Sequence, residues 1–370
     1  MKSKKKAILL KNTMEINRIT LVNYRKYSNR TFNFQKGINI LCGDNAAGKT
    51  TILEAIGFLI TCRTFKNASN KEIIKQTESV GGVSGSFLVE KTQKNAKLLI
   101  SNNYKKITLD NCDYKKVSDY VGFVKVVTFD NGDVNTIVGT PANKRKIFDF
   151  MMCQIDKEYL FLLKKYKKTI KEKSSLLRRS SIDNKVSHDL LDVLDNEIFD
   201  LIVLLNKKRI KFIEDINSEI KNVYKEFENN KESGQIRLKQ SFPLGGSFKD
   251  YTAYRAEEIK TQTCMVGPHR DDYIFYLNDV NIINHASQGQ IKTFAICLKL
   301  AYSKLIMGKT GAKPIVLLDD IFGELDAKRQ NSIIKMLDVG TQTIITTPSL
   351  TDIDKEILCK ANIIYLEKEE

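Results

Sequence analysis

The chain has 370 residues, of which 42% are hydrophobic, and its 60 basic and 44 acidic residues give a formal net charge of +16. This length allows two domains or one large domain with an insertion, and the hydrophobic content excludes a wholly disordered protein. No apolar run approaches the roughly 18 residues of a membrane span, so no membrane association is expected.

Residues 1–13 are expected to form a short tail, because too few apolar residues follow the first lysines for a signal peptide. Alternating apolar residues then predict a β-rich segment. A glycine loop and a helix from about Thr50 interrupt it. The predicted strands of this part cover residues 16–23, 32–34, 38–42, 83–89, 97–101 and 124–129.

From about Thr140 the apolar residues are spaced by three and four, which is typical of a helix, and Pro141 suits its first turn. A polar break at Ser180–Ser187 separates this run from a second one of the same period. Two helices of about 40 residues would each extend about 60 Å. They predict a helical hairpin inserted between two halves of an α/β domain, although ordinary helices on a core would give the same pattern. A strand near Tyr273–Leu277 follows.

The glycine loop fits the phosphate-binding pattern G-x-x-x-x-G-K-[ST]. Backbone N–H groups and the helix dipole would hold the β-phosphate of ATP. The Lys49 side chain would bridge the β- and γ-phosphates, and the Thr50 hydroxyl would bind Mg²⁺. A generic glycine turn is the weaker alternative, since a strand precedes this loop and a helix follows it. The predicted ATP-binding residues here are Gly43, Asp44, Asn45, Ala46, Ala47, Gly48, Lys49, Thr50 and Thr51.

Far along the chain, the apolar run 315–318 ends in Asp319 and Asp320. Such a run predicts a buried parallel strand. Asp319 is placed to hold Mg²⁺ and its water shell, and Asp320 to orient or deprotonate the attacking water. Apolar strands that end in Asp are common, so the two aspartates indicate an ATP site only in combination with the glycine loop. Lys49, Asp319 and Asp320 are the predicted catalytic residues.

Between these two elements, Ser287-Gln288-Gly289-Gln290 precedes a predicted helix. A serine and a glycine at a helix start offer a hydroxyl and free N–H groups to a phosphate, although an N-cap is the commoner meaning. The order glycine loop, Ser-Gln-Gly-Gln, Asp-Asp resembles that of ABC-type ATPases, and Leu325-Asp326 resembles their D-loop. The resemblance assigns Ser287, Gly289 and Gln290 to ATP bound by a second copy, which implies an ATP-dependent homodimer.

Within this class the chain resembles the RecF family of DNA-repair ATPases from about residue 15 to 368. The matching segments are Asn23–Tyr27, Lys144–Asp149, Gly267–Asp272 and Glu324–Asp326. No chemical role for Gly267–Asp272 follows from its residues, and a tight turn at a sheet edge is the alternative to a functional role.

The resemblance implies an α/β fold, with an ABC-type P-loop ATPase head and an inserted helical hairpin lobe. The head would cover residues 14–139 and 263–370, and the lobe 140–262. The implied function is ATP-dependent binding of double-stranded and gapped DNA, which helps to load a recombinase together with RecR and RecO type mediators.

The chain departs from the family's pattern at several positions. Phe129-Asp130-Asn131-Gly132-Asp133 stands where the family usually carries Pro-Glu-Asp after Phe-Ser, so only the last acid, Asp133, is kept. Thr347 occupies the place of the γ-phosphate-sensing His of many ABC ATPases, as in RecF-like chains generally. With Asp rather than Glu at 320, slow ATP hydrolysis is expected.

The excess of basic residues favours a polyanionic partner, although richness in Lys, Ile and Asn together can arise from base composition. Lys164–Arg179 holds eight basic residues and one acidic residue, which suits sequence-independent phosphate contacts. A solvated lysine-rich face is the alternative, and no motif for reading bases is present. The residues assigned to DNA are Lys144, Arg145, Lys164, Lys165, Lys167 and Lys168.

Seven scattered cysteines, odd in number and never spaced as C-x-x-C, argue against disulfides and zinc, so a cytoplasmic protein is expected. A transporter ATPase is disfavoured by the roughly 240 residues between glycine loop and signature. A chromosome-structuring ATPase would need far longer arms. A clamp that binds ATP without hydrolysis would not need Lys49, Asp319 and Asp320 together.

Overall fold

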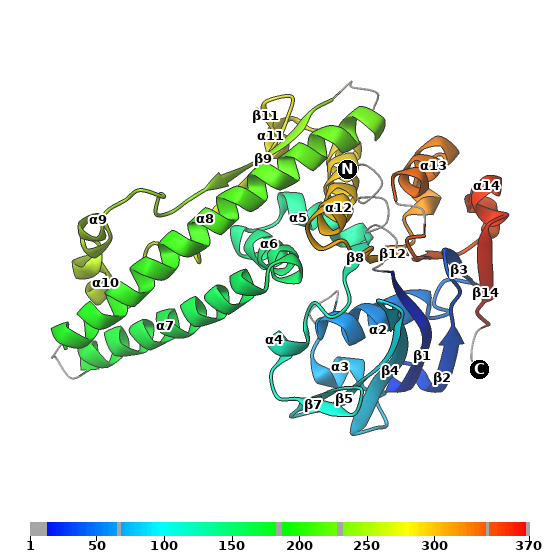
Figure 1. Cartoon of the computed structure of the whole chain (residues 1–370), viewed down its shortest axis with the longest axis horizontal. Helices are drawn as coiled ribbons and strands as arrows, with labels where there is room; N and C mark the ends of the chain where they lie inside the picture. Colours follow the sequence, from blue (N-terminus) through cyan, green and yellow to red (C-terminus); the bar gives the residue numbers. More distant parts are fainter. Residues whose placement is uncertain (1–12, 65–67, 183–186, 228–231, 338–339, 368–370) are drawn as a thin grey trace. The chain divides into compact units, whose positions relative to one another are not determined.

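The computed structural model describes residues 13–64, 68–182, 187–227, 232–337 and 340–367, so almost all of the predicted tail lies outside the described residues. The chain divides into two compact units (Figure 1). We call them the head unit (Met1–Asp133, Asn222–Asn230 and Ala295–Glu370) and the helical unit (Val134–Lys221 and Lys231–Phe294).

The head unit contains a five-stranded parallel sheet with the order β14-β3-β13-β12-β8. Strands β3, β8 and β12 contain buried aliphatic residues, as expected for parallel strands covered on both faces, whereas β14 at the edge is only half-buried. Since β13 lies between β3 and β12, the chain segments that follow these two strands leave the same edge of the sheet. The strands are β3 (Ile38–Cys42), β8 (Val126–Phe129), β12 (Ile315–Asp319), β13 (Thr343–Thr347) and β14 (Ala361–Tyr365).

A six-stranded antiparallel sheet completes the head unit, with the order β2-β1-β4-β5-β6-β7. Helix α2 (Lys49–Thr61) shares one hydrophobic core with both sheets: Ile52 and Phe58 of α2 belong to the same buried cluster as Ile16 and Leu317. The antiparallel strands are β1 (Met14–Tyr24), β2 (Tyr27–Asn33), β4 (Val80–Val89), β5 (Thr92–Ser101), β6 (Lys105–Leu109) and β7 (Cys112–Tyr114). The shorter helices of this unit are α3 (Asn70–Ile73), α4 (Val117–Tyr120), η1 (Asn131–Asp133), η2 (Phe322–Glu324), α13 (Ala327–Met336), η3 (Leu350–Asp352) and α14 (Lys355–Leu358).

The helical unit is dominated by two antiparallel helices, α7 and α8, which lie side by side (Figure 1) and are linked by ion pairs such as Lys165–Glu197. The unit extends beyond the lobe predicted at 140–262, because β10 pairs with β9 along its whole length. Its elements are α5 (Val134–Val138), α6 (Pro141–Ile155), α7 (Lys157–Ile182), α8 (His188–Phe227), β9 (Gly234–Lys239), α9 (Phe248–Thr252), α10 (Arg255–Thr261), β10 (Asp272–Leu277), β11 (Val280–Asn281) and α11 (Ile282–His285). Helices α8 and α12 (Gln288–Thr310) each cross a boundary between the units.

The prediction of a single long first helix is wrong, because α6 ends at Ile155 and α7 begins at Lys157. Asp156 between them has an extended backbone, and its Oδ1 accepts the N–H of Tyr159 at 2.9 Å, which caps the new helix. The apolar spacing continues through this break, so periodicity alone did not reveal it. The second long helix is confirmed: α8 has 40 residues.

The Gly267–Asp272 turn is held within the helical unit by the buried Arg209 of α8. Its guanidinium donates to Asp271 Oδ2 (2.8 Å), to Pro268 O (2.7 Å) and to Asp149 Oδ1 on α6 (2.8 Å). Removing one partner of such a buried ion pair typically costs about 3–5 kcal/mol. This contact gives two of the acidic residues in the segments that carried the resemblance a structural role, since Asp149 and Asp271 share one cation.

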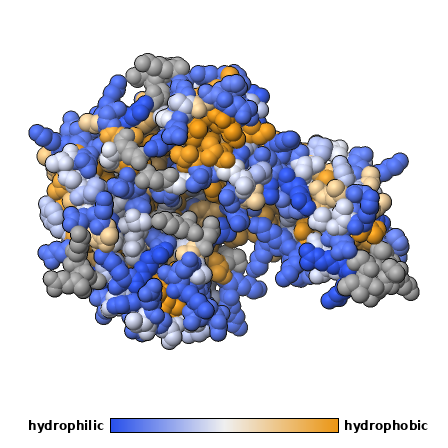
Figure 2. Space-filling view, turned by 180° about the vertical axis from the view of Figure 1, so that it is seen from behind, coloured by the Kyte–Doolittle hydropathy of each residue, from blue (hydrophilic) through white to orange (hydrophobic). Residues whose placement is uncertain are grey.

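Hydrophilic side chains dominate the face of the molecule drawn in Figure 2, where apolar side chains gather in a few areas. Among the described helices, none combines the length and the apolar character that crossing a membrane requires.

Candidate nucleotide-binding site

The glycine loop connects β3 to α2. At two of its positions a residue with a Cβ would collide with neighbouring atoms. Gly48 has a φ of +92°, and a Cβ there would collide with Lys26 Cε and lie 2.5 Å from the hydroxyl of Tyr27. A Cβ at Gly43 would lie 2.5 Å from Leu366 O. The loop therefore leaves its backbone exposed at the N-terminus of α2, where N–H groups and the helix dipole favour an anion.

Lys49 is buried, and its ammonium lies along the loop, where Nζ donates to Gly43 O and, at 2.9 Å, to Asp44 O. A second lysine approaches the other end of the loop: Lys26 Nζ donates to Ala47 O at 2.6 Å and to Ala46 O at 3.3 Å. The two ammonium groups thus satisfy four carbonyls of one loop.

The loop borders a cavity of about 240 Å³ in the head unit. Two of its lining residues, Arg25 and Lys26, were not assigned to the site from the sequence, although the segment that contains them was noted as resembling the family. Arg25 is fixed by Glu54 of α2, whose carboxylate accepts its Nε and Nη2 at 2.6 and 2.8 Å. The predicted site residues that line the cavity are Asn45, Ala46, Gly48, Lys49, Thr50, Thr51 and Asp320.

The carboxylate of Asp319 faces the start of α2. Its Oδ1 accepts hydrogen bonds from Thr50 Oγ1 (2.9 Å) and Thr346 Oγ1 (2.8 Å). Burial raises the pKa of Asp319 above its ordinary value, the two hydroxyl groups oppose this shift, and the negative charges of Asp130 and Asp320 add to it. A cation at this position would favour the ionised form.

The oxygen atoms of Thr50 and Asp319 fit Mg²⁺, which prefers hard oxygen ligands and usually takes only one or two from the protein beside phosphates and water. Among the described residues there is no cluster of three or more His, Cys, Asp or Glu that could hold a metal ion.

Asp320 adopts a left-handed backbone with a φ of +52°, which is strained for an aspartate. Its N–H donates to Thr346 Oγ1 at 2.9 Å. Thr346 of β13 therefore orients both aspartates, and the sequence had given no reason to single it out. Thr347, at the position of the γ-phosphate-sensing His, is fully buried and donates to Ser349 O at 2.7 Å.

Asp133, the one acid kept in the segment that departs from the family's pattern, is held by a lysine and by a backbone N–H. Asp133 Oδ1 accepts from Lys299 Nζ of α12 at 2.6 Å, and Oδ2 accepts from the backbone N of Asp130 at 3.0 Å. Burial raises the pKa of Asp133 to about 6, and the charge of Lys299 opposes the shift. The retained acid is thus engaged with Lys299, whereas it is the charge of Asp130 that acts on Asp319.

The Ser287–Gln290 segment belongs to the helical unit, whereas the glycine loop, Asp319 and Asp320 belong to the head unit. Ser287 Oγ accepts the N–H of Gln290 at 3.2 Å, and Gln290 Oε1 accepts the N–H of Ser287 at 2.8 Å. This reciprocal pair caps α12. Ser287 and Gly289 are exposed. The N-cap alternative therefore holds, and it leaves the other N–H groups of the first helical turn open to a ligand.

Lys144 does not belong to a DNA surface. It is buried, and its Nζ donates to Tyr273 O at 3.1 Å. The prediction that Lys144 contacts a DNA phosphate is therefore wrong. Lys173, inside the basic run, is also buried and pairs with Asp195 and Glu258. The remaining predicted lysines Lys164, Lys165, Lys167 and Lys168 are exposed on α7.

A family model described as an AAA domain matches residues 18–263. The DNA replication and repair protein RecF of Halalkalibacterium halodurans is 31% identical over 366 residues, which cover 96% of this chain and 98% of the relative. The RecF protein of Lactobacillus johnsonii is 33% identical over 359 residues, with 94% and 96% covered. The chain belongs to the RecF family.

Solved structures agree with this assignment. The recombination mediator protein RecF with ATP, of the RecFOR pathway, superimposes with a TM-score of 0.85 and 29% identity, and the match covers 92% of this chain and 94% of that one. An Smc head domain from Pyrococcus furiosus, at 14% identity and a TM-score of 0.54, shares the fold alone. The predicted RecF resemblance and the predicted ABC-type head with a helical insertion are confirmed.

Proposed function

We propose that this RecF-family chain binds ATP and Mg²⁺ at the glycine loop, dimerises when ATP is bound and hydrolyses ATP slowly. As an ATP-bound dimer it would bind double-stranded DNA at gapped or damaged sites and help to load a recombinase. The observation that carries this proposal is that the glycine loop, Thr50 and Asp320 line one cavity, while Asp319 accepts a hydrogen bond from Thr50. The solved RecF structures with ATP, and the repair role in the names of the relatives, support it.

Four side chains at the site have a chemical role in this proposal: Lys49, Thr50, Asp319 and Asp320. Lys49 exchanges its two carbonyl partners for the β- and γ-phosphates, and the N–H groups of the loop hold the β-phosphate. Mg²⁺, held by Thr50 and Asp319, would neutralise phosphate charge. Asp320 orients the attacking water or accepts its proton. Because aspartate reaches less far than glutamate, slow turnover is expected.

Dimerisation would complete the site. The open first turn of α12 presents Ser287 and Gly289 as further ligands for a γ-phosphate bound by a second copy, and Gln290 fixes Ser287 by the reciprocal cap. ATP would then stabilise the dimer by binding only the associated form, and loss of the γ-phosphate would release it.

The proposed partners are double-stranded or gapped DNA and RecR and RecO type mediators, in the cytoplasm. The net charge of +16 supports the DNA partner. The seven cysteines all lie among the described residues and form no disulfide, which supports a reducing compartment. Cations of the helical unit would contact phosphates, namely the half-buried Arg145 and the exposed Lys164, Lys165, Lys167 and Lys168.

The test is the mass in solution with ADP and with ATP, each with and without a short gapped duplex. We expect a dimer with ATP alone, and we expect that dimer to retain the duplex. Lys49→Ala should remove ATP binding and stay monomeric, which serves as the control. A wild-type protein that stays monomeric in every condition would contradict ATP-dependent dimerisation. An ATP-bound dimer that does not bind the duplex would contradict the DNA role.

A further inference from the structure

We propose that Arg145 and Arg270 form a phosphate-binding site for duplex DNA on the Gly267–Asp272 turn of the helical unit. The proposal rests on the proposed DNA binding and deepens it, since it gives the turn a function and adds a residue that the basic run of α7 did not suggest.

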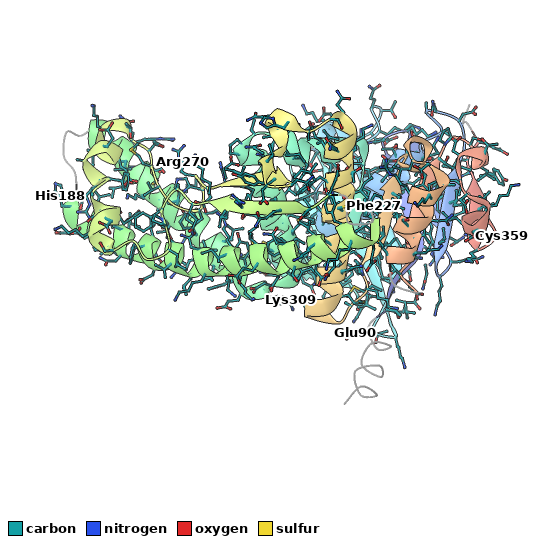
Figure 3. All side chains as sticks on the ribbon, turned by 90° about the horizontal axis from the view of Figure 1, so that it is seen from above. Glu90, His188, Phe227, Arg270, Lys309 and Cys359 are labelled. Atoms are coloured by element: carbon teal, nitrogen blue, oxygen red, sulfur yellow. The ribbon has the colours of Figure 1, made fainter. Side chains whose placement is uncertain are left out.

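Arg270, labelled in Figure 3, is exposed, and its guanidinium is held by a backbone carbonyl. Its Nε and Nη2 donate to Cys264 O at 3.2 and 3.1 Å, and Nη2 also reaches Thr263 Oγ1 at 3.3 Å. A guanidinium has five N–H donors, so these contacts leave its Nη1 side open. A fork that is already oriented loses less conformational entropy when it binds a phosphate.

Arg145 reaches the same turn from α6. Its Nη1 donates to Asp271 O at 2.6 Å, one residue from Arg270. Among the residues that the structure describes, neither Arg145 nor Arg270 forms an ion pair with a carboxylate. Both are anchored by backbone carbonyls, which carry no net charge, and therefore keep their full positive charge for an outside anion.

The lysines of α7 differ in this respect. Lys165 lies 2.8 Å from Glu197, Lys167 3.3 Å from Asp149, and Lys168 3.5 Å from Glu172. A DNA phosphate would have to compete with these carboxylates. The two arginines face no such competitor, which is why we place the stronger phosphate contacts on the turn.

The charge around the turn is positive even after its acids are counted. Arg209 binds both Asp149 and Asp271, and Lys144 lies 3.8 Å from Asp272. His269 adds no charge near neutral pH, because burial and the nearby Arg270, Arg145 and Arg209 lower its pKa to about 4. Three carboxylates (Asp149, Asp271, Asp272) thus stand against five cations: Lys144, Arg145, Lys167, Arg209 and Arg270.

The turn itself is rigidly held, which a site of fixed geometry needs. Ser241 Oγ accepts the N–H of Gly267 and donates to its carbonyl oxygen, both at 2.8 Å. His269 is bound on both ring nitrogens, by the Tyr166 hydroxyl at 2.6 Å and by Cys264 O at 3.0 Å. The same carbonyl, Cys264 O, orients His269 and Arg270.

The test uses the full chain loaded with ATP and a short gapped duplex, with affinity measured between about 50 and 200 mM salt. Arg145→Gln and Arg270→Gln should each lower the slope of log affinity against log salt by about 1, and the double variant by about 2. Lys211→Gln is the matched control, since it removes one exposed, ion-paired charge of α8 in the same unit. Its slope should equal that of the wild type.

Arg270→Lys should restore the wild-type slope, because it restores the charge, and thermal melting of each variant checks the fold. The proposal is overturned when the double variant melts normally and keeps the wild-type slope. A slope lowered by Lys165→Gln and Lys168→Gln, but not by the arginine variants, would leave the DNA role standing and reject this site. A wild-type protein without duplex affinity in any nucleotide state would reject both.

Discussion

At the residue scale, the glycine loop is held by two lysines that come from distant positions in the sequence. Lys49 follows from the loop pattern itself. Lys26 lies between β1 and β2, and only the folding of these strands beside α2 brings its ammonium to Ala46 and Ala47. A cation that already lies beside the phosphate cavity is expected to contribute to nucleotide binding as well as to the shape of the loop.

Lys26→Gln should weaken ATP binding by about tenfold, because one charge-assisted contact is worth about 1.5 kcal/mol or more. The measurement is titration calorimetry with ATP. Lys75→Gln is a matched control, since Lys75 is a half-buried lysine of the same unit whose ammonium donates to the Ser28 hydroxyl and does not line the cavity. Equal affinities for the Lys26 variant and this control would show that Lys26 has no role in binding.

At the element scale, the contacts of the Gly267–Asp272 turn give this segment a structural role. Arg209 joins the turn to α6 and α8, and His269 joins it to α7. Since Nε2 of His269 faces the carbonyl of Cys264, this nitrogen carries the proton, and Nδ1 accepts from Tyr166. The hydrogen bond from Tyr166 requires the neutral ring, because a protonated Nδ1 could not accept it.

This arrangement predicts a pH dependence of stability. The pKa of His269 in the folded chain, about 4, lies below its ordinary value of 6.5. Between these two pH values His269 is protonated in the unfolded chain but stays neutral in the folded chain. The contribution to stability is therefore complete above pH 6.5 and is lost as the pH falls towards 4. It amounts to at most about 3 kcal/mol.

His269→Gln should flatten this part of the profile. The free energy of unfolding, measured in urea at several pH values, should fall more steeply for the wild type than for the variant between pH 6.5 and 4.5. The carboxylates contribute equally to both proteins, so the difference between the two profiles isolates His269. Parallel profiles would mean that the folded protein accommodates a charged His269.

At the scale of the whole molecule, the predicted ATP site is composite. The residues of one chain supply the cavity in the head unit and Ser287 in the helical unit, and the proposal requires that two copies exchange these parts. Ser287→Ala should bind ATP but fail to dimerise, because it loses both a γ-phosphate ligand and the cap of α12.

Mixing variants gives a sharper test of this exchange. Lys49→Ala and Ser287→Ala should each remain monomeric with ATP when alone. Their mixture can form one complete site, from the glycine loop of the Ser287 variant and the signature of the Lys49 variant. A dimer that appears only in the mixture, detected by light scattering with ATP, is the expected outcome. Normal dimerisation of the Ser287 variant alone would contradict contacts in trans.

The sequence by itself determined those elements whose signal lies within one short segment of the chain. Gly43–Thr50 requires a fixed spacing, the strand that ends at Asp319 is a continuous apolar run, and α8 shows one helical period over its length. Each of these signals lies within a single segment, so it could be interpreted without knowledge of the fold. Their order along the chain was enough to indicate the family and the ABC-type head.

Only the tertiary structure decided which charges are free to act. Lys144 and Lys173 look like surface lysines in the sequence but are buried, while Arg270 lies in a turn and remains unpaired by any described carboxylate. The break at Asp156 and the roles of Lys26 and Thr346 were hidden for the same physical reason. Burial, pairing and capping depend on neighbours that are distant in the sequence or that compete with the local pattern, and these are fixed only when the chain packs.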